Sequence, residues 1–194
     1  MINRISEKLS YELSSRQQST SDEKEIYAYS IEVLLSLAIN LIILSVTSII
    51  LGKIPELIIF IMFFSGLRTF AGGYHAKTHK ECMILSFTVF MLSAYSKIWF
   101  AAYGETVMII GILASVLLVF LYAPTDSENK PLSINEKNKF MKVSRGIVIL
   151  LCIIIIFLYS IKTQTHNIYL TAVSAMVIES ISLIKLINQH HSNI

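Results

Sequence analysis

The chain has 194 residues, a mean hydropathy of +0.65, 54% hydrophobic residues and only 15% charged residues, which excludes an ordinary soluble domain with about 25% charged residues. Seven glycines, three prolines and long apolar runs exclude a collagen-like or disordered chain. The net charge of +3 is spread along the chain and does not indicate nucleic acid binding. We therefore expect an all-α, polytopic membrane protein.

The N-terminal segment, residues 1–29, carries charges of both signs and no small-residue cleavage site, so we expect no removable signal peptide. Apolar residues recur there at helical spacing, which predicts an amphipathic helix. That helix lies on the membrane, on a partner or on the protein's own cytoplasmic face. The residues that define the spacing are Ile2, Ile5, Leu9 and Leu13.

Residues 30–194 form the predicted transmembrane domain, because a helix needs about 20 mainly apolar residues to cross a bilayer. The second of six candidate spans is short, and we expect segment 54–70 to make a true but distorted crossing. Gly72 and Gly73 after it indicate either a helix end or a pocket lined by protein. The six spans are residues 33–51, 57–67, 83–104, 106–123, 146–161 and 168–187.

The basic residues predict the orientation of these spans. With a cytoplasmic N-terminus, the outer side holds only Lys53, Lys97 and Lys162, and the other thirteen of the 16 Lys and Arg residues are cytoplasmic. This asymmetry follows the positive-inside rule. It predicts a multi-pass cell-membrane protein with both termini, loop 68–82 and a basic loop 124–145 on the cytoplasmic side.

Loop 68–82 has the highest concentration of polar and charged side chains in the chain. A thiolate at Cys82 needs a neighbouring histidine or cation. In a straight helix His79 is adjacent to Cys82, whereas His75 lies about 10.5 Å away along the axis. If the backbone after the glycine pair is irregular, His75 can fold back onto Cys82, so the spacing leaves both bases open.

Other interpretations of this loop need no thiol chemistry. His75, His79 and Cys82 have a spacing that could hold zinc, although a convincing fourth ligand is missing. The loop could also be solvated, with its cations anchoring the membrane boundary. In the last span, Glu179 either pairs with a cation such as Arg68 or lies at the interface, which the sequence slightly favours.

The two remaining features are Cys152 and loop 124–145. Cys152 lies in an Ile-rich run and is predicted to be a core residue. The basic loop is either an ordinary cytoplasmic loop or a binding surface for an acidic, membrane-associated peptide. Its basic residues are Lys130, Lys137, Lys139, Lys142 and Arg145.

The stretch Arg68-x-x-x-Gly-Gly-x-His75-Ala, with Cys82 seven residues after His75, resembles the accessory gene regulator B (AgrB) family of membrane peptidases of Gram-positive bacteria. The chain size, the six apolar segments and the Ala-Pro…Asn-Lys-Pro-Leu loop also resemble that family. The resemblance implies a cysteine endopeptidase that trims the C-terminal part of a short AgrD-type propeptide and helps to cyclise it into a quorum-sensing peptide.

The resemblance also assigns residues and partners. It maps the catalytic pair onto His75 and Cys82, which requires a bent backbone between Gly72 and Lys80. The expected partners are the propeptide, the lipid bilayer and a second copy of the chain, with no nucleic acid and no cofactor. The main rival is a small membrane transporter or partner subunit, with Arg68 and Glu179 along its pathway. The implied supporting residues are Arg68, Gly72, Gly73, Lys130, Lys137 and Lys139.

Overall fold

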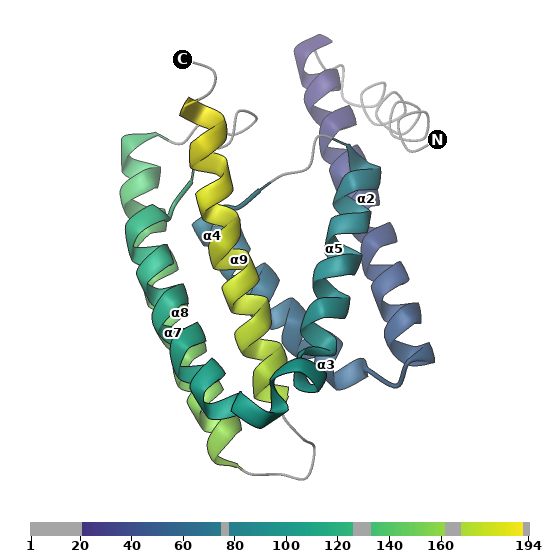
Figure 1. The fold of residues 1–194 in the computed structure, drawn as a ribbon. Helices are drawn as coiled ribbons and strands as arrows, with labels where there is room; N and C mark the ends of the chain where they lie inside the picture. Colours follow the sequence, from purple (N-terminus) through teal and green to yellow (C-terminus); the bar gives the residue numbers. More distant parts are fainter. Residues whose placement is uncertain (1–20, 75–77, 126–132, 162–167, 192–194) are drawn as a thin grey trace. The chain divides into compact units, whose positions relative to one another are not determined.

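The structure is a computed structural model that describes residues 21–74, 78–125, 133–161 and 168–191. Within these residues every regular element is helical and no strand occurs, which confirms the all-α prediction (Figure 1). The chain divides into two compact units, Met1–Thr47 and Ser48–Ile194. The elements are α2 (Ser21–Ile50), α3 (Ile54–Phe60), the π-helical η1 (Ile61–Ser65), α4 (Gly66–Ala71), α5 (His79–Ala94), α6 (Ser96–Phe100), the 3₁₀-helical η2 (Ala101–Tyr103), α7 (Gly104–Tyr122), α8 (Ile134–Ser160) and α9 (Ile168–His191).

Helix α2 contains the first apolar span, Ser30–Ile50. The helix ends where Gly52 adopts a left-handed φ of 63°, which glycine reaches without steric cost. The amide of Gly52 donates to the Ile49 carbonyl and that of Lys53 to the Ser48 carbonyl, the two bonds of a Schellman motif. The amphipathic helix predicted at the start of the chain lies outside the described residues.

The second span is one continuous helical run of 18 residues, Ile54–Ala71, with a π-helical turn in its middle. It is about 27 Å long, close to the thickness of a hydrocarbon core. Phe60 stacks on Phe64 at 5.0 Å and meets Phe90 of α5 edge-on at 5.5 Å. The prediction of a short and distorted second span is confirmed.

Among the described residues, four helical runs are long and apolar enough to cross a membrane: Ser30–Ile50, Ile54–Ala71, Gly104–Tyr122 and Ile134–Ser160. In α9 the apolar stretch Ile168–Ile184 is shorter. The predicted span 83–104 differs from the structure, because α5 ends at Ala94 and a turn with two short helices, α6 and η2, leads into α7. Helix α5, with 16 residues, is therefore only about 24 Å long.

Helix α8 also differs from the prediction. It begins at Ile134, so residues 134–145, which we expected in a loop, are helical and continue directly into the apolar part. The reason is a capping box: the hydroxyl of Ser133 accepts from the Glu136 amide, and the Glu136 carboxylate accepts from the Ser133 amide. Cys152 lies in the apolar part and is buried, as predicted.

Helix α9 is the centre of the second unit and contacts α3, α4, α5, α6, α7 and α8. Its contact with α7 is the most extensive, since Gly111 of α7 leaves room for Val173 of α9, and an added Cβ there would overlap the valine. Between Leu170 and Leu183, most side chains of α9 are buried or half-buried, although Ile181 is exposed, as expected for a central helix. Its buried residues are Leu170, Thr171, Ala172, Val173, Ala175, Met176, Glu179, Ser180 and Leu183.

The loops that carry the predicted site begin at one end of the second unit. Figure 1 shows the end of α4, the start of α5, the end of α7 and the start of α8 at the same end. The amide of Thr125, just after α7, donates to the carbonyl of Ala71 at the end of α4 at 3.0 Å. This arrangement fits the predicted placement of loops 68–82 and 124–145 on one side.

Candidate functional site

Cys82 lies in the first turn of α5 and is half-buried. Thr78 caps this helix in an extended conformation, and its hydroxyl accepts from the amide of Glu81 at 3.2 Å. The amide of Cys82 donates to the Thr78 carbonyl at 3.0 Å. Cys82 therefore lies at the N-terminal end of α5.

The described backbone on either side of residues 75–77 is not helical. Helix α4 ends at Ala71, and Gly72 and Gly73 follow with φ of 82° and 147°. Helix α5 begins only at His79, so His75 precedes it, and the separation calculated for a straight helix does not apply. The predicted bend is confirmed for residues 72–74. Residues 75–77, including His75, lie outside the described residues, so the pairing of His75 with Cys82 stays a prediction.

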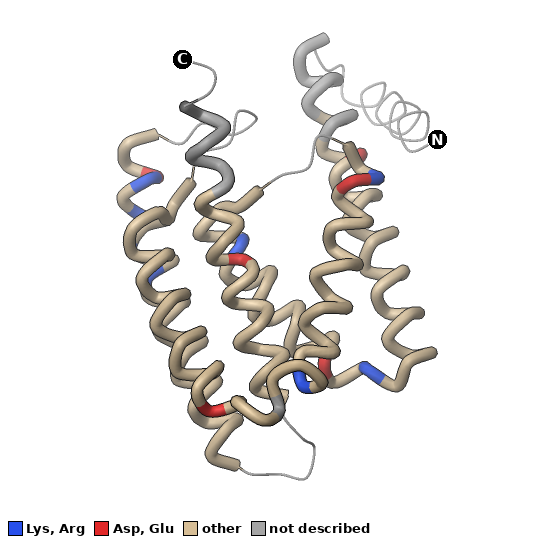
Figure 2. The backbone as a smooth tube through the Cα atoms, in the orientation of Figure 1, with Lys and Arg blue, Asp and Glu red and all other residues tan. Residues whose placement is uncertain are grey.

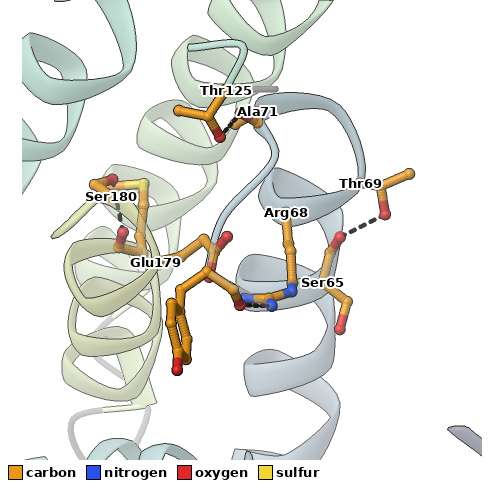
Figure 3. Close-up of polar contacts among 9 residues, drawn as sticks. Ser65, Arg68, Thr69, Ala71, Thr125, Glu179 and Ser180 are labelled. Carbon is orange, nitrogen blue, oxygen red and sulfur yellow. Dashed lines mark hydrogen bonds and ion pairs between the residues drawn. The ribbon is translucent and has the colours of Figure 1, made fainter. Parts of the chain in front are cut away.

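Arg68, in the last turn of α4, connects three parts of the second unit. Its Nη1 donates to Oε2 of Glu179 on α9 at 3.2 Å, and its Nη2 donates to the carbonyl oxygen of Tyr74. Figure 3 shows the Arg68 side chain extending from α4 toward Glu179. The carbonyl of Tyr74 belongs to the peptide group that precedes His75, so Arg68 holds the chain next to the predicted base.

Glu179 has a fully buried side chain, whereas 22% of the Arg68 side chain is exposed. The pairing with Arg68, one of the two alternatives that the sequence left open for Glu179, is therefore found. Burial of a carboxylate without a partner is costly, which explains why α9 packs against the arginine of α4. Figure 2 shows most of the described Lys, Arg, Asp and Glu residues toward the ends of the helices.

The two glycines are required by close packing. A Cβ added to Gly73 would overlap Oε1 of Glu179 and would lie 2.9 Å from Oγ of Ser182, so residue 73 lies directly against α9. A Cβ added to Gly72 would lie 2.5 Å from Oγ1 of Thr125. The pair thus ends α4, which is one of the two alternatives that the sequence left open, and it packs closely against α9 and Thr125.

The predicted substrate-handling residues lie in a different environment. Lys137 and Lys139 are exposed on the first turns of α8, and Lys130 lies outside the described residues. Further along α8, Arg145 donates to the Phe120 carbonyl at 3.0 Å and covers the Phe120 ring at 4.9 Å. The structure therefore separates an exposed basic helix start from an arginine that joins α8 to α7.

Comparison with known proteins identifies the family. A family model described as Accessory gene regulator B matches residues 2–183. The chain belongs to this family. An AgrB-like protein 2 of Clostridium perfringens strain 13 is 30% identical over 148 residues, which cover 73% of this chain and 69% of the relative. An AgrB-like protein of Clostridium acetobutylicum is 29% identical over 167 residues, which cover 84% of this chain and 79% of the relative.

An AgrB-like protein of Listeria innocua is 26% identical over 141 residues, which cover 71% of this chain and 68% of the relative. No solved structure matches the chain significantly. AgrB membership implies a role in the processing of a quorum-sensing peptide, an AgrD-like propeptide as partner and a membrane setting. The apolar helices of the fold agree with that setting.

The sequence pointed to most of this region but missed two of its contacts. The sequence did not indicate the contact of Thr125, because its hydrogen bonds to Ala71 join residues 54 positions apart. Tyr74 contributes a backbone carbonyl, which no side-chain pattern reveals. Glu179 did give a signal, as an acidic residue within an apolar segment, but its partner lies 111 positions away.

Proposed function

We propose that this AgrB-family protein is a cysteine endopeptidase that removes the C-terminal part of an AgrD-like propeptide at the membrane boundary. Cys82 is the nucleophile and His75 is the base. The observation that carries the proposal is the bend at Gly72 and Gly73, after which α5 starts at His79. Because His75 is outside the helix that bears Cys82, the seven-residue spacing is compatible with a direct pair.

The first half of the reaction forms an acyl-enzyme. His75 accepts the proton of the Cys82 thiol, and the sulfur attacks the carbonyl carbon of the scissile peptide bond. The carbon–nitrogen bond then breaks, and His75 returns the proton to the departing amine, as in Cys-His proteases. The C-terminal fragment leaves with a free amine, and the rest of the propeptide remains bound to Cys82 as a thioester.

The second half releases a cyclic product. A thiol within the bound propeptide attacks the thioester carbonyl, a new carbon–sulfur bond forms, and the bond to Cys82 breaks. The product is a thiolactone, and Cys82 regains its proton. One thioester replaces another, so the activated acyl group is kept. The half-buried position of Cys82 limits the access of water, which would otherwise give a linear acid.

The supporting features follow from the same proposal. Exposed Lys137 and Lys139 attract acidic residues of the propeptide through long-range electrostatics, together with Lys130. The site and both termini are on the cytoplasmic side of the cell membrane, and the protein functions as a homodimer. The reaction as written requires no cofactor.

The test is propeptide processing in proteoliposomes, with mass spectrometry of Cys82. Wild type is expected to yield a thioester-linked peptide, whereas Cys82→Ser and His75→Ala yield neither adduct nor product. His79→Ala and the matched control Cys152→Ser, which replaces a buried cysteine in α8, are expected to retain processing. If Cys82→Ser still processes the peptide, the thiol mechanism is wrong and a transporter or partner subunit becomes the better interpretation.

A further inference from the structure

Glu179 takes no part in the proposed chemistry. It lies in the middle of the central helix α9, its side chain is fully buried, and it binds Nη1 of Arg68 at 3.2 Å. The other terminal nitrogen of Arg68 binds the Tyr74 carbonyl. A single guanidinium therefore joins a buried carboxylate of α9 to the peptide group that immediately precedes His75.

The geometry of arginine makes this connection directional. Its guanidinium is planar and presents its donors in a rigid fork, so the partner of one nitrogen determines where the other nitrogen points. Phe64 supports the same group, with its ring centre 5.5 Å from the Arg68 guanidinium carbon. Removal of Glu179 would leave Arg68 free to turn toward water, because 22% of its side chain is already exposed.

Gly73 provides a second contact between the same carboxylate and the same segment. There is no space for a Cβ between residue 73 and Oε1 of Glu179. Glu179 therefore meets the segment directly at Gly73 and, through Arg68, at Tyr74. Both contacts act on the two residues that come just before His75.

We propose that Glu179 is a positioning residue for the peptidase reaction. It orients Arg68, Arg68 holds the Tyr74 carbonyl, and this contact sets the backbone position from which His75 approaches Cys82. The inference rests on the proposed function of His75 and Cys82. It assigns to Glu179 of α9 a role in a reaction whose proposed catalytic pair, His75 and Cys82, lies 97 to 104 positions earlier in the chain.

A purely structural ion pair would explain the contact between Arg68 and Glu179 equally well, so the experiment has to separate the two roles. The double variant Arg68→Met/Glu179→Leu does so, since apolar replacement of both partners of a buried ion pair is often neutral or stabilising. It keeps the helices packed but removes the donor to the Tyr74 carbonyl. A structural role predicts normal processing by this variant, whereas a positioning role predicts a defect.

The measurement is kcat and KM for propeptide processing in proteoliposomes, with the melting temperature of each variant in detergent. Glu179→Leu and the double variant are expected to lose about 100-fold in kcat with KM unchanged, because a shift of about 1 Å in a reacting group has such an effect. The double variant is expected to melt at or above the wild-type temperature. Glu179→Gln keeps an oxygen that accepts from Arg68 and is expected to stay within about tenfold of wild type.

The matched control is Ser180→Ala, next to Glu179, whose buried hydroxyl bonds only the Met176 carbonyl among the described residues. It is expected to process the propeptide at the wild-type rate. Wild-type kcat in the double variant, or equal inactivity of Glu179→Gln and Glu179→Leu, would overturn the positioning role. Failure of the proposed function is a separate result, since it appears as processing by Cys82→Ser.

Discussion

The region around Arg68 and the start of α8 both carry charged side chains, but the two sets of side chains lie in different environments. Arg68 is bound to a buried carboxylate and to a backbone carbonyl. Lys137 and Lys139 are exposed on the first turns of α8. Under the proposed function, Arg68 holds the backbone near the site whereas the exposed lysines of α8 attract the substrate, and burial distinguishes the two roles.

The largest expected effect is that of Arg68→Met. It leaves the buried carboxylate of Glu179 without its cation, which destabilises a protein by about 3–5 kcal/mol. We expect a large drop in the free energy of unfolding, measured by chemical denaturation in detergent. The neighbouring variant Thr69→Ala, at an exposed position, is the control and should change stability by less than about 0.5 kcal/mol. Equal stability of the two variants would show that the pair is not needed for packing.

A smaller effect is expected from Gly73→Ala. The added methyl group overlaps Glu179 and the φ of 147° is unfavourable for alanine, a strain of about 1–3 kcal/mol. The displaced segment should lower kcat by about 100-fold in the proteoliposome assay. In Gly66→Ala the new methyl meets nothing within 4 Å, so this control should be active and about 0.5–1 kcal/mol more stable. An active Gly73→Ala protein would contradict close packing of this segment against α9.

The smallest effect is expected for the exposed lysines of α8. Neutralising both lysines, Lys137→Gln with Lys139→Gln, should raise KM by about two- to tenfold and leave kcat and stability unchanged, because exposed charges contribute about 1 kcal/mol or less. The difference should shrink at high salt. Lys97→Gln in α6, at the opposite end of the second unit, is the control and should not alter KM. A change in kcat instead of KM would place these lysines in the reaction and weaken the contrast with Arg68.

Local signals in the sequence predicted much of the fold. Apolar runs identified the helices, and the short run before Arg68 predicted the distorted second span that contains η1. The spacing of Ser133 and Glu136 is also a local signal, and it explains the early start of α8 that the prediction placed in a loop. For α5 the apolar run continues past Ala94, so hydropathy overestimated the helix, which ends in a turn at Tyr95.

In the candidate site, too, local sequence features were predictable and contacts between distant residues were not. Polar residues around Gly72 and Gly73 predicted the region, and the family resemblance predicted the bend, which glycine permits because it adopts positive φ values that other residues rarely adopt. Sequence reasoning named Arg68 as one possible partner of Glu179 but could not decide the pairing, and it gave no partner for Gly72 or Gly73. Arg68 could have met any acidic residue, and its choice of Glu179 depends on how α4 and α9 pack.

The sequence by itself determined the helical class, the membrane setting and the family, since these depend on apolar runs and on a compact motif. Only the tertiary structure decided that Glu179 faces Arg68, that Gly73 lies against α9 and that Thr125 is bonded to Ala71. The physical reason is distance along the chain. Local patterns record helix formation, whereas contacts between residues 54 to 111 positions apart arise only when the helices pack.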